Sequence, residues 1–169
     1  MEIKLIELDE IDDVLRIYSE AAEQMTKDGC LTWKNGYPNR NMAIEDIEDK
    51  AMYGAYDDEG DILGLLTLNN KVDPVYDDLR WETGDKPFLV IHRLAVSLKG
   101  KGKGIGSMLI DFSVEKARKH GCSSVRLDAY HKNWRAKRLY ESKGFVDVGI
   151  VQFVKNDGVN YCLERVLNN

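Results

Sequence analysis

The stretch from Phe88 to Phe112 constrains the fold more than any other part of the chain. An apolar run, FLVIHRLAV, leads through SLKGKGKGIGS into the amphipathic segment MLIDF. The first run has the length and composition of a buried strand, and the last has the spacing of a helix that starts near Gly104. The chain is therefore predicted to contain a strand, a glycine-rich turn and a helix in immediate succession.

The glycine-rich turn has the composition of a phosphate-binding site. Glycines at positions 100, 102, 104 and 106 permit backbone conformations that are closed to residues with a Cβ atom. Successive amide N–H groups can then converge at the N-terminus of the following helix, where phosphate binds readily. Lys99, Lys101 and Lys103 add positive charge around this point.

Two common nucleotide motifs fit this turn poorly. A mononucleotide P-loop needs Gly-Lys followed directly by Ser or Thr, whereas here Gly104 follows Gly102-Lys103 and the nearby hydroxyl is Ser107. A dinucleotide turn needs GxGxxG and an acid about 20 residues later, which Gly102, Gly104, Ser107 and Asp128 match only loosely. An unspecialised basic loop is the third interpretation.

The whole chain has ordinary globular composition. With 169 residues, of which 43% are hydrophobic and 31% charged, we expect one domain that spans residues 1–169. The N-terminus lacks a basic region followed by an apolar stretch, and no apolar run approaches the roughly 18 residues of a membrane span. These features predict a cytoplasmic protein.

Charge and cysteine content exclude several classes of function. A net charge of −5 argues against a nucleic-acid surface, so the local basic segments suit a small anionic ligand. Cys30, Cys122 and Cys162 form no CxxC pair, which argues against a disulfide framework or a zinc site. The three histidines lie on different predicted elements without ligand spacing, so no metal is expected.

Hydrophobic periodicity divides the remainder into helices and strands. Asp9 is a candidate N-cap, and Asp28-Gly29 ends the first helix. The predicted strands are residues 2–8, 51–56, 62–68, 88–96, 124–130, 144–154 and 159–166. The predicted helices are residues 9–28, 42–50, 104–120 and 133–142. A long connection covers residues 69–87, and the last two strands meet around Asn156-Asp157-Gly158.

This order of elements predicts an α/β fold with a mixed sheet. The crossover from the strand at 88–96 through the helix to the strand at 124–130 makes these two strands parallel neighbours. The other strands follow one another as hairpins, so they are predicted to pair antiparallel.

The glycine turn and the later segment NWRAKRLYESKGF together resemble the GNAT superfamily of acetyl-CoA-dependent N-acetyltransferases over nearly the whole chain. The family's turn, usually Gln/Arg-x-x-Gly-x-Gly/Ala, aligns on Lys101, Gly102, Lys103, Gly104, Ile105 and Gly106. Lysine replaces the usual glutamine or arginine at the first position. The second motif, an asparagine, a helix with a leucine-tyrosine pair and Gly-Phe, aligns on Asn133, Leu139, Tyr140, Gly144 and Phe145.

The resemblance implies a sheet of about seven strands flanked by about four helices, splayed between the fourth and fifth strands. The pantetheine arm of acetyl-CoA would lie in that gap and bond the backbone of Leu94, Ala95 and Val96. The pyrophosphate would sit on the amides of Lys101, Gly102, Lys103, Gly104, Ile105, Gly106 and Ser107. Asn133 would bond the coenzyme arm, and it is equally suited to cap its helix.

Acetyl transfer to an amine needs a neutral amine, a polarised carbonyl and a protonated leaving thiolate. Tyr140 matches the family's usual general acid, since a phenol with a pKa of about 10 stays protonated at neutral pH. His92 is the first candidate for the base and Glu82 the second. The resemblance implies that the backbone N–H near Leu94 polarises the carbonyl.

Four aromatic residues in loop-like segments are candidates for acceptor binding, because in this fold those loops flank the acceptor cleft: Trp33, Tyr37, Tyr76 and Trp81. The predicted reaction is acetyl transfer to a primary amine of a small molecule or peptide, by direct attack in a ternary complex. The alternative is a catalytically silent acyl-CoA-binding or sensing module, with a dinucleotide-dependent oxidoreductase third. No nucleic-acid or membrane partner is expected, and a homodimer is compatible with the sequence.

Overall fold

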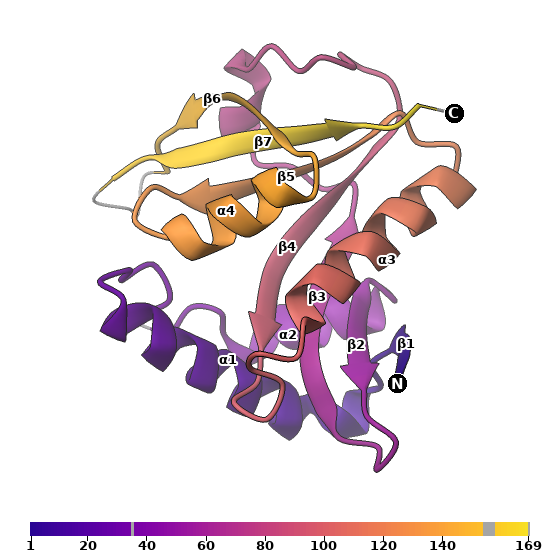
Figure 1. Cartoon of the computed structure of the whole chain (residues 1–169), viewed down its shortest axis with the longest axis vertical. Helices are drawn as coiled ribbons and strands as arrows, with labels where there is room; N and C mark the ends of the chain where they lie inside the picture. Colours follow the sequence, from indigo (N-terminus) through magenta and orange to yellow (C-terminus); the bar gives the residue numbers. More distant parts are fainter. Residues whose placement is uncertain (35, 154–157, 169) are drawn as a thin grey trace. The chain divides into compact units, whose positions relative to one another are not determined.

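The structure is a computed structural model that describes residues 1–34, 36–153 and 158–168. It has seven strands and four α-helices, in the predicted order (Figure 1). The strands are β1 (Glu2–Leu5), β2 (Met52–Tyr56), β3 (Ile62–Asn69), β4 (Phe88–Val96), β5 (Ser124–Tyr130), β6 (Val146–Val151) and β7 (Asn160–Val166). The helices are α1 (Ile11–Lys27), α2 (Arg40–Glu48), α3 (Ile105–Lys119) and α4 (Trp134–Ser142), with short 3-10 turns η1 (Leu8–Glu10) and η2 (Pro74–Asp78).

The strands form a mixed sheet in the order β1-β2-β3-β4-β5-β7-β6. The pair β4 and β5 is parallel, as the crossover predicts, whereas the hairpin strands pair antiparallel. Parallel pairing with β5 covers only Phe88 to Val90, the first part of β4. The prediction of a mixed sheet splayed after this point is confirmed.

The chain divides into two compact units. Unit 1 comprises Met1–Leu68 and His92–Phe112, and unit 2 comprises Asn69–Ile91 and Ser113–Asn169. Both β4 and α3 contribute their two halves to different units. A single domain over residues 1–169 therefore stays a prediction.

Unit 1 is built on the apolar face of α1. The sequence periodicity predicts Ile11, Val14, Leu15, Tyr18, Ala21, Ala22 and Met25 on that face. Of these, Ile11, Val14, Tyr18 and Ala21 are buried together with Ile17, whereas Leu15, Ala22 and Met25 are half-buried. The buried residues join a core to which β2 and β3 contribute Met52 and Leu65, both fully buried. The helices α1 and α2 pack on each other, and α2 begins at Asn39, whose side chain accepts a hydrogen bond from the Met42 amide at 2.9 Å.

Unit 2 contains the pair β5 and β7, extended by β6, and α4 packs beside β5 (Figure 1). The long connection before β4 is partly ordered by η2, which places Tyr76 against Val151 and Cys162 in a second buried cluster. Residues of the connection are therefore part of the core of this unit.

The structure moves several predicted boundaries. Asp9 does not cap α1, because Glu7 and Glu10 close the turn η1 and the helix begins only at Ile11. The predicted turn around Asn156-Asp157-Gly158 falls mostly outside the described residues. All three cysteines are buried and free of disulfides. Among the described residues, none of the helices is both long and apolar enough to cross a membrane.

Candidate active site

The glycine turn of unit 1 is fastened to β3. Ser97 and its successors fold back so that the Ser97 amide and hydroxyl both donate to the carbonyl oxygen of Leu63, each at 2.9 Å. A Cβ atom on Gly100 would lie 2.2 Å from that carbonyl oxygen, so only glycine fits here. The backbone of the turn therefore lies in direct contact with the backbone of β3.

The end of the turn presents free amides. Gly102 and Gly104 have φ angles of 76° and 75°, in the left-handed region that favours glycine. Within the described parts of the chain, the amides of Gly104, Ile105 and Ser107 have no hydrogen-bond acceptor. Unpaired amides at a helix N-terminus carry partial positive charge and bind phosphate groups. The residues present therefore fit the pyrophosphate that the sequence predicts.

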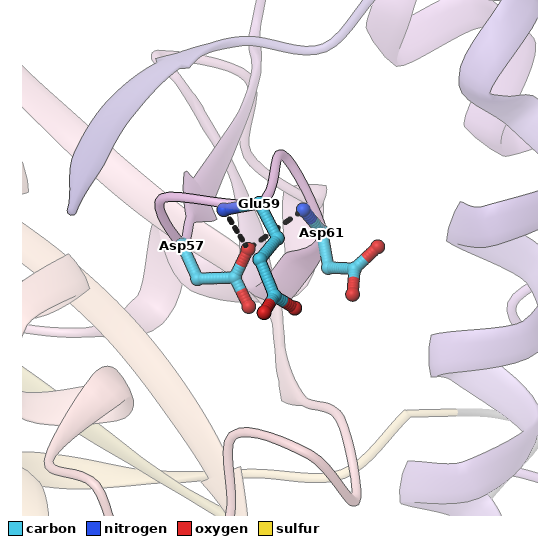
Figure 2. Close-up of side chains that lie close together, drawn as sticks. All are labelled: Asp57, Glu59 and Asp61. Carbon is cyan, nitrogen blue, oxygen red and sulfur yellow. Dashed lines mark hydrogen bonds between the residues drawn. The ribbon is translucent and has the colours of Figure 1, made fainter.

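The lysines of the turn have different surroundings. Lys99 Nζ lies 2.7, 3.0 and 2.5 Å from carboxylates of Asp57, Glu59 and Asp61 in the hairpin between β2 and β3. Figure 2 shows these three acids close together, with the amides of Glu59 and Asp61 bonded to Asp57. The cluster has the spacing of a cation site, but the ammonium group of Lys99 contacts all three carboxylates.

Lys101 and Lys103 are exposed. The ammonium group of Lys101 donates to Gln24 of α1 at 2.8 Å. Lys99 holds the turn against the hairpin between β2 and β3, because its ammonium group pairs with the three carboxylates there. The net positive charge around the predicted phosphate site is therefore smaller than three lysines would give.

Strand β4 passes from unit 2 into unit 1 at His92, and its backbone is irregular at the next residue, Arg93, which we call the bend of β4. His92 is half-buried, and Arg93 next to it has a φ of 50°. Leu94, Ala95 and Val96 follow directly and complete the strand. The predicted base and the predicted backbone donors therefore lie on either side of one irregular residue.

Three aromatic residues gather near this bend in unit 1. The ring of Trp33 meets Tyr18 edge-on at a centroid distance of 5.5 Å and Tyr37 at 6.5 Å. Tyr37 is 42% exposed, whereas Tyr18 is buried. The hydroxyl of Tyr18 has no hydrogen-bond partner in the part of the chain that the structure describes. Burial raises the pKa of this hydroxyl, so it stays protonated.

In unit 2, Asn133 and Tyr140 lie at opposite ends of α4. The Asn133 side chain accepts a hydrogen bond from the amide of Ala136 at 3.3 Å, which confirms its role as N-cap. Tyr140 is buried and its ring packs on Phe145 at 6.1 Å. Burial first, and then the negative charge of Asp128, raise the pKa of Tyr140. The phenol is therefore held in its protonated, donating form.

The carboxylate of Asp128 lies among neutral partners. It accepts hydrogen bonds from the hydroxyl of Tyr76 and from Asn160 Nδ2, the latter at 2.6 Å. Burial raises the pKa of this carboxyl and outweighs the opposite effect of the two hydrogen bonds. Tyr76 is 4% exposed and its hydroxyl is occupied by Asp128.

Two other predicted residues of unit 2, Trp81 and Glu82, are linked to Arg126: Trp81 contacts its guanidinium, and the Glu82 amide and Arg126 share Glu164 as acceptor. Trp81 stacks under the Arg126 guanidinium at 4.5 Å and contacts the ring of Tyr76 at 5.6 Å. Glu82 is exposed, and its amide donates to Glu164 at 2.6 Å. Tyr76 and Trp81 thus have structural partners that the sequence did not indicate.

The predicted site residues fall into two groups. Unit 1 holds His92, Leu94–Val96, Lys101–Ser107, Trp33 and Tyr37, and unit 2 holds Glu82, Asn133, Tyr140, Tyr76 and Trp81. Sequence reasoning missed Asp46, Arg93 and the role of Asp128. For Arg93 and Asp128 the available signal was a charged residue inside an apolar strand run, in FLVIHRLAV and SVRLDAY respectively, whereas Asp46 lies on the helix α2 and carried no such signal.

Sequence comparisons agree with the motifs. Residues 12–145 match the model of the acetyltransferase (GNAT) family. An uncharacterized N-acetyltransferase of Archaeoglobus fulgidus is 26% identical over 144 residues, which is 85% of this chain and 91% of the relative. A streptothricin acetyltransferase of Escherichia coli is 31% identical over 126 residues, which is 73% of this chain and 64% of that relative.

Solved structures share the fold. A GNAT-family acetyltransferase from Streptococcus agalactiae superposes with a TM-score of 0.85 at 24% identity, covering 99% of this chain and 96% of that one. The NatC complex bound to Gag peptide and CoA has a TM-score of 0.70 at 18% identity, covering 99% and 100%. With both motifs in place and the family model matched across both units, the chain belongs to the acetyltransferase (GNAT) family and is an acetyltransferase.

Proposed function

We propose that this enzyme transfers an acetyl group from acetyl-CoA to a primary amine of a small molecule or peptide, by direct attack in a ternary complex. The observation that carries the proposal is the set of unpaired amides at the start of α3, next to two glycines with positive φ. Such a turn binds the pyrophosphate of a coenzyme. The GNAT family, to which the chain belongs, uses acetyl-CoA.

The coenzyme is held mainly by backbone groups in this proposal. Amides from Lys101 to Ser107 bind the pyrophosphate, and the backbone of Leu94, Ala95 and Val96 bonds the pantetheine arm. Asn133 bonds the arm with the part of its amide that does not cap α4. Acetyl-CoA supplies the activated thioester, from which the acetyl group passes to the amine nitrogen.

Three groups of the chain handle charge and protons. The amide N–H of Leu94 donates to the thioester carbonyl oxygen, where negative charge develops. Tyr140 gives its phenolic proton to the departing sulfur, and a phenol carries this proton at neutral pH. His92 removes one proton from the ammonium form of the acceptor, which leaves the neutral amine that attacks the thioester, and Glu82 is the second candidate for this role. The proton that the nitrogen then loses on forming the amide replaces the one that Tyr140 gave to the sulfur.

In unit 1, acceptor binding is assigned to Tyr37, which is exposed, and to the half-buried Trp33, whose ring contacts that of Tyr37. Tyr76 and Trp81 of unit 2 are proposed to shape the acceptor side indirectly. Their rings pack on each other and so form one aromatic pair. Aromatic faces attract organic cations, which suits an amine substrate. A cytoplasmic location and a homodimer stay predictions.

The test is release of CoA from acetyl-CoA, followed with a thiol reagent. The acceptor panel contains polyamines, aminoglycosides, amino acids and short peptides, with streptothricin added because the E. coli relative bears that name. A no-acceptor reaction is the control for hydrolysis. Acceptor-dependent release supports the proposal and identifies the substrate class.

A second measurement separates the alternatives. A ligand that binds only the folded protein raises its melting temperature. We expect acetyl-CoA, and not NAD, to raise it. Stabilisation by acetyl-CoA without release by any acceptor would favour the silent acyl-CoA-binding module, and stabilisation by NAD alone would favour the oxidoreductase.

A further inference from the structure

Arg93 has a backbone conformation that is unusual for its place in a strand. Its φ of 50° lies in the left-handed region, and it sits in the middle of β4. This region costs a non-glycine residue roughly 1–2 kcal/mol, which is why glycine is favoured in this conformation. An arginine here indicates that the side chain performs a task that glycine cannot.

The side chain of Arg93 is anchored on Asp46 of α2. Its Nε and Nη2 atoms both donate to Oδ2 of Asp46, at 3.2 and 2.5 Å. Thr67 of β3 donates its hydroxyl to the same oxygen at 2.7 Å. Asp46 is 7% exposed and the side chain of Arg93 13% exposed. A buried pair of this kind resists separation, because either charge alone would be desolvated and unpaired.

The peptide unit that follows Arg93 contains the amide N–H of Leu94. Because the peptide group is planar, the direction of that N–H is set by the backbone dihedrals of Arg93. Holding the guanidinium on α2 and β3 therefore limits the rotation of this amide and fixes the direction in which the backbone continues to Ala95 and Val96.

We infer that Asp46 and Arg93 are positioning residues for acetyl transfer: their ion pair holds the bend of β4 and so directs the amides of Leu94–Val96 at the coenzyme arm and its thioester carbonyl. This inference rests on the proposed function. Donors that stabilise developing charge must be aimed before the reaction, and a displacement of about 1 Å can cost roughly 10²-fold in rate.

The kinetic test uses Asp46→Asn, which keeps the shape of the side chain and removes its charge. We expect kcat to fall at least tenfold at a temperature well below the melting point, with a smaller proportional rise in KM for acetyl-CoA, because the pyrophosphate amides still bind the coenzyme. Asp12→Asn is the matched control, since Asp12 pairs with Arg40 at 3.0 Å on the exposed surface of the same unit. A lowered melting temperature with unchanged kcat in Asp46→Asn would overturn the inference.

A mutant cycle tests whether Asp46 acts through Arg93. Arg93→Gly accepts the positive φ without strain but lacks the anchor, so kcat should again fall. In the Arg93→Gly background, Asp46→Asn should have no further effect on kcat. If the two losses multiplied instead, Asp46 would act independently of Arg93 and the inference would be wrong.

An acceptor-free measurement keeps the inference separate from the proposed function. In ¹⁵N-labelled wild-type protein, acetyl-CoA should shift the amide resonances of both Leu94–Val96 and Gly104–Ser107. In Asp46→Asn only the second set should keep the wild-type shifts. Wild-type shifts at both sets in the variant would overturn the inference alone, whereas no shifts in the wild type would overturn the proposed function and the inference with it.

Discussion

Two carboxylates of unit 2, Glu164 on β7 and Asp128 on β5, have opposite surroundings. Glu164 is 2% exposed and accepts hydrogen bonds from the hydroxyl of Thr83 at 2.5 Å, the amide of Glu82 at 2.6 Å and Nε of Arg126 at 3.2 Å. Burial alone would raise its pKa, but these partners outweigh burial and lower it. In the described part of the chain, Asp128 accepts hydrogen bonds from the neutral donors Tyr76 and Asn160, and burial raises its pKa.

The difference separates a structural region from a candidate catalytic one. The partners of Glu164 fasten the connection before β4 to the strands, and its charge is compensated. Asp128 raises the pKa of Tyr140, the proposed general acid, and its hydrogen-bond partners among the described residues are neutral. Groups with perturbed and uncompensated charge concentrate at active sites, although structural networks also perturb pKa values. Changes in the Glu164 region should therefore affect stability, and changes around Asp128 should affect the reaction.

The largest effect is expected for Arg126→Met. This change leaves Glu164 buried without its cation, which typically costs about 3–5 kcal/mol of unfolding free energy. It also removes the guanidinium from the rings of Trp81 and Phe88, which it contacts at 4.5 and 3.9 Å. Urea unfolding measures the loss.

The double variant Arg126→Met with Glu164→Leu is the matched control for this loss. Replacing both partners by apolar side chains removes the unpaired charge, so most of the stability should return. A double variant as unstable as the single one would mean that the ion pair is not the cause.

Tyr140→Phe should lower activity and leave stability nearly unchanged. Loss of a general acid lowers kcat by about 10²-fold or more, equivalent to roughly 2.7 kcal/mol, while the buried ring keeps its packing on Phe145. The melting temperature should stay within about 2 °C of wild type. Steady-state kinetics with an acceptor found in the panel would check this, and an unchanged kcat would remove Tyr140 from the mechanism.

The two regions also differ in how far the sequence predicted them. The turn before α3 and the cap at Asn133 depend on local residue types, so their spacing identified them. The partners of Asp128 lie on η2 and β7, and those of Arg93 on α2 and β3. Such contacts join residues distant in the chain, and no local pattern encodes them. Tyr76 is an example: its position in a long connection gave no sign that its ring is buried and its hydroxyl bonded to Asp128.

Asn133→Ala tests how α4, which carries Tyr140, is fixed at its start. Loss of an N-cap typically costs about 1 kcal/mol. Asn133→Ser is the control, because serine keeps the cap but is too short to replace the amide toward a coenzyme. If Asn133 also bonds the coenzyme arm, both variants should raise KM for acetyl-CoA, and only the alanine variant should lose stability. An unchanged KM in both would leave Asn133 with capping alone.

The smallest expected effect is on the pH dependence of stability in Asp128→Asn and Glu164→Gln. This measurement tests directly whether the two carboxylates have opposite surroundings. The raised pKa of Asp128 means that the folded protein binds its proton more tightly than the unfolded chain does. This contribution to stability is complete below the ordinary carboxyl pKa and is lost as pH rises through the raised value. Asparagine removes the titration, and its amide can donate to the Tyr76 hydroxyl while its oxygen accepts from Asn160. The melting temperature of Asp128→Asn relative to wild type should therefore rise from pH 4 to pH 7.5, by about 2 °C.

Glu164→Gln should show the reverse slope. The lowered pKa of Glu164 adds stability above the ordinary carboxyl value, and that stability is lost as pH falls through the lowered one. The variant should be less stable than wild type at pH 7.5, and the deficit should shrink toward pH 4. Scanning calorimetry across this range measures both slopes. Slopes of the same sign would mean that Asp128 is compensated by a partner as Glu164 is, and the division of unit 2 into a structural and a reactive carboxylate would fail.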